Sequence, residues 1–198
     1  GRFGLLGLRS ALSLAGSRFA GEKARGLFTG MAAHSILDLH KPATAAFGLV
    51  LGMVGHVVGW SIPKRGSQEI TNALVRELES LGGEIVPDTP VTSLAIAGDA
   101  GAVLFDTNPR QLRDIAGEAL PAWYRRVIGN YRHGSGVFKL DWALDGPVPW
   151  TAPDCARAGT VHLGPTMEEI AASERAASEG RISDRPFVIL AQQSLFDP

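Results

Sequence analysis

Apolar residues recur at helical spacing in several parts of the chain. Between residues 67 and 81 four of them follow one another at intervals of four, four and three: Ile70, Leu74, Leu78 and Leu81. This spacing places them on one face of a helix. Ser67 is placed to cap the start of that helix, and Gly82 and Gly83 end it.

Capping signals predict further helices. Asn108 precedes Pro109 and is followed three residues later by Gln111, which is the pattern of a helix start. Thr166 and Glu169 repeat that spacing before residues 167–180. Residues 121–129 form another predicted helix, and residues 1–40, with their interspersed glycines, predict several short ones.

Strand signals lie between these helices. In residues 136–144 the side chains alternate between two faces. One face is apolar, with Phe138, Leu140, Trp142 and Leu144, and the other carries Val137, Lys139, Asp141 and Ala143. Short strands are also predicted within 84–94, 102–106, 158–164 and 186–190. Helices followed by strands that alternate with helices indicate an α+β fold with a mixed or antiparallel sheet flanked by helices.

Residues 42–63 contain no Asp, Glu, Lys or Arg, although they include His56. Two pairs of glycines at i and i+4 lie in this segment, Gly48 with Gly52 and Gly55 with Gly59. A membrane-spanning helix needs about 20 predominantly apolar residues, which this stretch barely reaches. We predict a helix packed inside the protein or at an interface between copies of the chain. Peripheral contact with a membrane and a true span are the alternatives.

Composition excludes some functions. The formal charge of −1, from 19 basic and 20 acidic residues, offers no excess of positive charge for a nucleic acid. The single cysteine, Cys155, has no partner for an internal disulfide. We therefore expect the protein in a reducing compartment such as the cytoplasm. The chain opens on Gly1 and closes soon after the apolar run 186–190, so we expect a piece of a longer protein.

Motifs for catalysis and metal binding are not found in the sequence. The one G-x-G run, Gly134-Ser135-Gly136, has Lys139 where a dinucleotide-binding turn needs its third glycine. The five histidines are scattered, so no metal site is predicted. Catalytic residues are not identified by any pattern in the chain.

Several blocks of sequence nevertheless resemble one family. They are GHVVGWSIPKRGSQEITNALVRELESLGGEIVPDTPVTSL, AVLFDTNPRQLRDIAGEALP, GVFKLDWALDGPVPW, AGTVHLGPTMEEIAASE and RPFVILAQQSLFDP. Together they cover nearly the whole chain and resemble the phytoene desaturases, or phytoene dehydrogenase-like flavoproteins, within the amine-oxidase-like superfamily. The PKRG turn departs from the paired glycines usual in that block.

The resemblance implies a division into three segments. Residues 1–60 would be the helical part of a substrate domain, 61–109 a partial FAD-domain segment, and 110–198 the substrate-domain sheet with its helices. It also implies contact of Gly66 and Val91 with FAD, Val91 at the adenine end. The nucleotide-binding fingerprint of the family lies outside these blocks.

The implied activity is removal of hydride from a C–H bond of a lipophilic substrate by FAD. An apolar tunnel would align that substrate, and we expect His34 and His56, with Phe138 and Trp142, to line it. Two alternatives stay open: a non-catalytic lipid- or membrane-associated binding module, and an amine-oxidising flavoenzyme.

Overall fold

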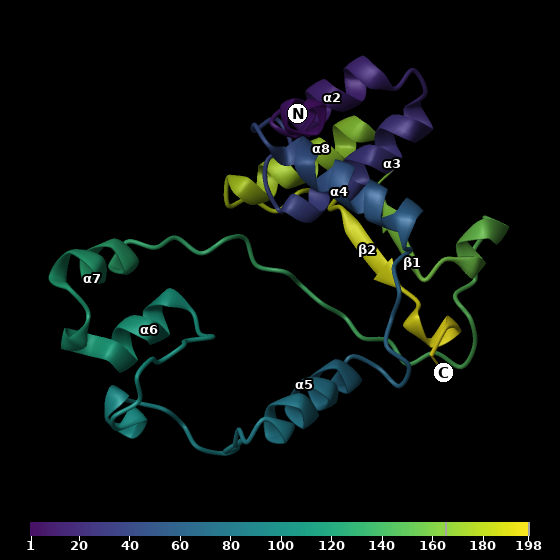
Figure 1. Cartoon of the computed structure of the whole chain (residues 1–198). Helices are drawn as coiled ribbons and strands as arrows, with labels where there is room; N and C mark the ends of the chain where they lie inside the picture. The colour runs from purple at the N-terminus through teal and green to yellow at the C-terminus, as the bar shows by residue number, and fades with distance from the viewer. Residues whose placement is uncertain (165, 198) are drawn as a thin grey trace. The chain divides into compact units, whose positions relative to one another are not determined.

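The computed structural model describes residues 1–164 and 166–197, apart from the side chain of Arg2. The chain divides into two compact units (Figure 1). The discontinuous unit comprises Gly1–Ile70 and Ser135–Pro198, and the inserted unit comprises Thr71–Gly134. The family resemblance divides the chain into 1–60, 61–109 and 110–198 by functional segments, whereas these two units are defined by compactness. The three-segment division therefore stays a prediction.

Six helical elements build most of the discontinuous unit. They are α1 (Arg2–Gly7), α2 (Ala11–Arg18), α3 (Glu22–Ala32), the 3-10 helix η1 (Ala33–Ser35), α4 (Thr44–Val57) and α8 (Met167–Ser178). The predicted cap of α8 is confirmed, because the Thr166 side chain accepts a hydrogen bond from the Glu169 N–H. The Glu169 carboxylate instead pairs with Arg185 at 2.9 Å.

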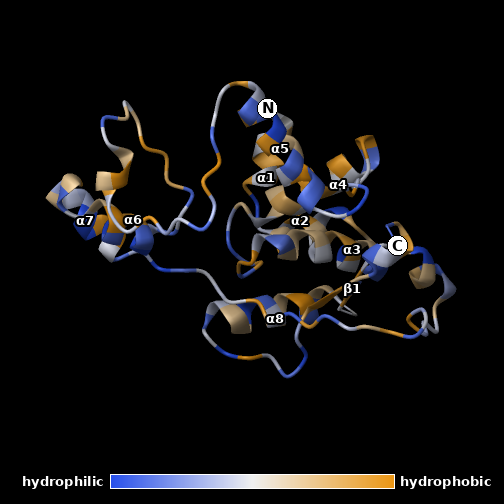
Figure 2. Ribbon diagram, turned by 90° about the horizontal axis from the view of Figure 1, so that it is seen from below, coloured by the Kyte–Doolittle hydropathy of each residue, from blue (hydrophilic) through white to orange (hydrophobic). Residues whose placement is uncertain are grey.

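The core of this unit lies where α2, α3, α4 and α8 meet. Its buried residues are Ala11, Leu14, Ala15, Phe28, Ala32, Ala33, Leu39, Ala45 and Ile170. More than half of them are alanines, so the helices approach one another closely. Hydrophobic positions run through α1 to α4 in the hydropathy colouring of Figure 2.

A helix is confirmed for most of the uncharged segment, and α4 packs against the core along one side. Its buried side is small, formed by Thr44, Ala45 and Gly48. A Cβ atom on Gly48 would lie 2.8 Å from Cε2 of Phe28, so only glycine allows α3 to come this near. Within the described residues, no helix combines the length and apolar character that a membrane crossing requires.

The sheet has two antiparallel strands, β1 (Thr160–Leu163) and β2 (Val188–Ala191). Thr160 pairs with Ala191, and His162 pairs with Ile189. The strands predicted at both places are therefore confirmed, as is a helix-rich α+β architecture with antiparallel pairing. Beyond β2, the Gln192 side chain donates to two carbonyls and accepts from the Trp150 indole, which fixes the connecting loop.

Three strand predictions are wrong. Residues 84–94, 102–106 and 136–144 adopt no strand, and Phe138 and Trp142 are 88% and 73% exposed. Figure 1 draws 136–144 as an uncoiled ribbon. Alternating side chains become a strand only where another strand accepts and donates backbone hydrogen bonds, and among the described residues none pairs with these segments.

The inserted unit is helical. It contains most of α5 (Gln68–Ser80), α6 (Pro109–Ala116), α7 (Ala122–Gly129) and two 3-10 turns, η2 (Leu94–Ala97) and η3 (Gly117–Ala119). The predicted capping box at Asn108 and Gln111 is present in both directions. Two further 3-10 turns, η4 (Pro153–Arg157) and η5 (Gln193–Leu195), belong to the discontinuous unit.

Candidate functional site

Two histidines that are 128 residues apart in sequence meet in the discontinuous unit. His34 lies on η1 and His162 lies on β1, and their Nε2 atoms are 3.1 Å apart. The ring centroids are 5.0 Å apart and the ring planes are inclined at 46°. At this distance one imidazole N–H can donate to the other ring nitrogen, provided that at least one ring is neutral.

Two neighbours position the His162 ring. The Phe187 ring packs against it in an edge-to-face arrangement, with centroids 5.4 Å apart and planes at 77°. On the α3 side, a Cβ atom on Gly30 would lie 3.1 Å from His162 Nδ1, so the absence of a side chain at Gly30 makes room for the imidazole. Phe187 is itself held, because its N–H donates to the buried Ser173 Oγ at 2.9 Å.

The environment of His162 favours its neutral form. Burial lowers the pKa of His162 below its ordinary value, and a positive charge on the neighbouring His34 lowers it further. A neutral imidazole keeps a lone pair on one ring nitrogen. His162 can therefore serve as a base or a ligand at neutral pH.

A second polar cluster lies a few residues beyond His34. The Asp38 carboxylate accepts from the His40 N–H at 3.0 Å and from His40 Nδ1 at 2.7 Å, and Arg175 of α8 donates to its other oxygen at 3.3 Å. Burial is the largest influence on the Asp38 pKa and raises it. The hydrogen bonds from His40 and Arg175 together outweigh burial and hold the pKa below its ordinary value.

This cluster borders an open hollow of about 690 Å³ along α8. Its lining includes His40 and three arginines, Arg175, Arg181 and Arg185. Each arginine is paired with a carboxylate: Arg175 with Asp38, Arg181 with Glu179, and Arg185 with Glu169. The charges of the hollow are thus largely balanced within it, which makes it a weak attractor for an anionic ligand.

The paired Asp38 makes stability depend on pH. Because its folded-state pKa is lower than in the unfolded chain, the ion pairs stabilise the fold above the ordinary pKa of 3.8, and the effect is lost as pH falls through the folded-state value. We expect Asp38→Asn to lower the free energy of unfolding by about 0.5–1 kcal/mol at pH 7. The difference from the parent should shrink toward pH 3.

Urea unfolding followed by circular dichroism at pH 7 and pH 3 measures this. Asp145→Asn, at an exposed carboxylate of the same unit, is the control and should change little at either pH. A difference between Asp38→Asn and the parent that is equal at both pH values would contradict the role assigned to the ionised carboxylate.

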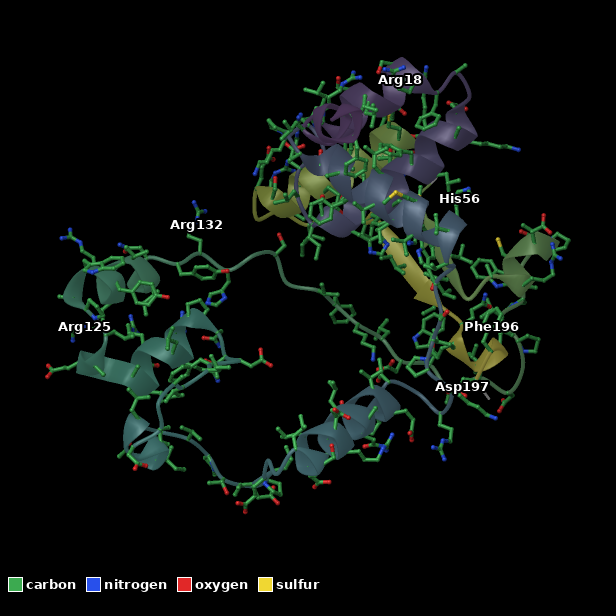
Figure 3. All side chains as sticks on the ribbon, in the orientation of Figure 1. Arg18, His56, Arg125, Arg132, Phe196 and Asp197 are labelled. Carbon is green, nitrogen blue, oxygen red and sulfur yellow. The ribbon has the colours of Figure 1, made fainter. Side chains whose placement is uncertain are left out.

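The residues predicted to line a tunnel are not gathered in one place. His34 joins His162, whereas His56 is exposed at the last turn of α4, where its Nδ1 lies 2.7 Å from the Gly52 carbonyl oxygen (Figure 3). Phe138 and Trp142 are on the exposed 136–144 segment. The contact of all four with a substrate stays a prediction.

The two predicted cofactor residues lie in different units. Gly66 has a left-handed φ of +88° in a turn closed by its N–H on the Pro63 carbonyl. The neighbouring Arg65 also has a positive φ, 70°, and its N–H donates to Asp197 Oδ1 at 2.8 Å. Val91, in the inserted unit, is 46% exposed.

Sequence reasoning missed His162, Phe187 and Gly30 as parts of a site. His162 stands in a four-residue strand with no recognisable ligand spacing, and its partner is 128 residues away. The only signal present was a histidine in a short strand flanked by Gly159 and Gly164. It carries too little information to identify His34 as the other member.

Comparison with known proteins adds no assignment. No protein-family model, no curated protein and no solved structure matches the chain.

Proposed function

We propose that this chain is part of an FAD-dependent oxidoreductase of the phytoene dehydrogenase-like type, which removes hydride from a C–H bond of a lipophilic substrate. The proposed fold is that of the substrate domain of amine-oxidase-like flavoproteins, with part of the FAD domain. The proposed location is the cytoplasm, with peripheral contact to a membrane. The support in sequence is the series of resembling blocks that spans most of the chain.

The observation that carries the lipophilic part of the proposal is the outward face of α4. Large apolar side chains occupy it: Phe47, Val50, Met53 and Val57 are 43%, 40%, 52% and 75% exposed. The spacing of three, three and four residues keeps these side chains on one side of the helix. The side chains of α4 are therefore small toward the core and large toward the outside, opposite to an ordinary surface helix.

An outward apolar face of this kind suits a hydrocarbon substrate. Burying exposed apolar area gains about 25 cal/mol per Å², so a few such side chains supply substantial affinity for a long apolar molecule. They also exclude water from the reacting bond. No acid–base pair is needed for that contribution, since hydride transfer to a flavin is chemistry that the cofactor supplies.

The described residues do not by themselves fit FAD. The Gly134-Ser135-Gly136 run is extended and no helix begins after it, so it offers no helix N-terminus to a pyrophosphate. Gly66 and Val91 would supply an edge of the site at most. We therefore derive no catalytic step through the flavin from this chain.

The test is made on the protein expressed from its complete reading frame. Bound FAD should appear in the absorbance spectrum, and an isoprenoid hydrocarbon should bleach it without oxygen. Val57→Asp is expected to raise the apparent KM for the hydrocarbon about tenfold, because the loss of one apolar contact costs about 1.5 kcal/mol or more. Flavin content should not change.

Ile182→Asp is the matched control, since Ile182 is 94% exposed and lies away from α4 in sequence. His56→Ala and Trp142→Ala should slow flavin reduction if those residues also contact substrate. Equal kinetics in Val57→Asp and Ile182→Asp would remove the α4 face from the site. Reduction by amines but not by hydrocarbons would favour the amine-oxidising alternative.

A non-catalytic lipid-binding module is the second candidate. The apolar face of α4 is followed by the exposed Trp60 and by Lys64 and Arg65, a pattern typical of a protein surface that contacts lipid head groups. Absence of flavin from the protein, together with co-sedimentation with anionic vesicles, would favour this module over the enzyme.

A further inference from the structure

The two Nε2 atoms of His34 and His162 lie at the separation of two ligands of one metal ion. They are 3.1 Å apart. Two imidazole nitrogens on a tetrahedral zinc ion, each at 2.0–2.1 Å, are about 3.3 Å from one another. The separation of the two nitrogens therefore has to change by only a few tenths of an ångström, and the rings must turn so that both Nε2 lone pairs point at the ion.

We propose that His34 and His162 form a binding site for a divalent transition-metal ion of the zinc and copper class. This site does not depend on the proposed flavin chemistry. Imidazole is a ligand suited to Zn²⁺, Cu²⁺ and Ni²⁺, whereas Mg²⁺ and Ca²⁺ prefer oxygen.

The metal ion can bind without any net gain or loss of protons by the two histidines. Each neutral imidazole carries one N–H. In the hydrogen-bonded pair one of these protons lies between the two Nε2 atoms. On metal binding that proton moves through solvent to Nδ1 of the same ring, and both Nε2 lone pairs face the ion.

The fold orients one ligand before the ion arrives. The His162 backbone is fixed by its pairing with Ile189, and its ring lies against Phe187 and Gly30. His34 follows α3 directly on η1. Ligands that are already ordered lose less conformational entropy on binding.

The described residues supply two ligands from their side chains. Over residues 1–164 and 166–197, no set of three or more His, Cys, Asp or Glu side chains is close enough to hold an ion together. Water or donor atoms of an incoming molecule must complete the coordination. We therefore expect weaker binding than at a four-ligand structural zinc site, and tighter binding of Cu²⁺ than of Zn²⁺ or Ni²⁺.

The first experiment titrates the chain with Cu²⁺ and with Zn²⁺ by calorimetry. His34→Gln and His162→Gln should each weaken binding about tenfold or more, since even the loss of a group that only orients a metal ligand costs 10–100-fold. The double variant should be little worse than either single one. His40→Gln and His56→Gln are the controls, because His40 tests the rival Asp38–His40 pair and His56 tests an exposed lone histidine.

A second measurement needs no substitution. Low amounts of Cu²⁺ added to the parent chain should broaden the imidazole NMR signals of His34 and His162 before those of the other three histidines. Earlier broadening of His40, or loss of affinity in the two controls equal to that in His34→Gln, would overturn the proposal. Unchanged affinity in both His34→Gln and His162→Gln would do the same.

Discussion

Gly48→Ala is expected to destabilise the discontinuous unit by about 1–3 kcal/mol, although alanine is the better helix former. The added Cβ would lie 2.8 Å from Cε2 and 3.1 Å from the carbonyl oxygen of Phe28. The ring of Phe28 is 4% exposed and cannot swing into solvent, and the carbonyl belongs to the backbone of α3. The helices must therefore separate, which loosens the contact at the centre of the core.

Gly52→Ala, one turn further along α4, is the matched control. Its added Cβ would meet only the flexible end of Met31, with Cε at 3.4 Å. Removing a helical glycine gains up to about 1 kcal/mol, so this variant should be as stable as the parent or more stable. Urea unfolding of the two variants side by side measures the difference. If Gly48→Ala is as stable as Gly52→Ala, close packing at Gly48 is not what holds α3 against α4.

Thr44→Val is expected to lower the free energy of unfolding by about 1–3 kcal/mol, because it leaves a buried backbone donor without its acceptor. The Thr44 Oγ1 accepts from the Ala11 N–H at 2.9 Å and donates to the Lys41 carbonyl at 2.8 Å. Both Thr44 and Ala11 are fully buried. This hydroxyl joins the first turn of α2 to the first turn of α4.

Thr29→Val provides the comparison within the same unit. Thr29 is also fully buried, but its hydroxyl has no hydrogen-bond partner among the described residues. Replacing that hydroxyl by a methyl group of the same shape should be neutral or stabilising. Equal losses at Thr44 and Thr29 in thermal unfolding would contradict the assignment of the cost to the Ala11 N–H.

The sequence alone was sufficient for features that depend on neighbours within one turn of a helix. The capping box of Asn108 and Gln111 formed as predicted, and Thr166 caps α8. The glycines of 43–60 correctly indicated close helix packing, since Gly48 lies against Phe28. The two caps are local signals because the atoms that satisfy them lie three or four residues away, so no distant element needs to be known.

Tertiary structure decided where strands form and which polar groups meet. Residues 136–144 alternate more regularly than 160–163, yet only the latter pair with another strand. The His34–His162 contact likewise depends on β1 reaching the end of α3, which Gly30 permits. A strand needs hydrogen bonds from a distant segment, and a side-chain pair needs two segments brought within 3–4 Å. The spacing of residues along one segment predicts neither of these, because both depend on a second segment that comes near only when the chain packs.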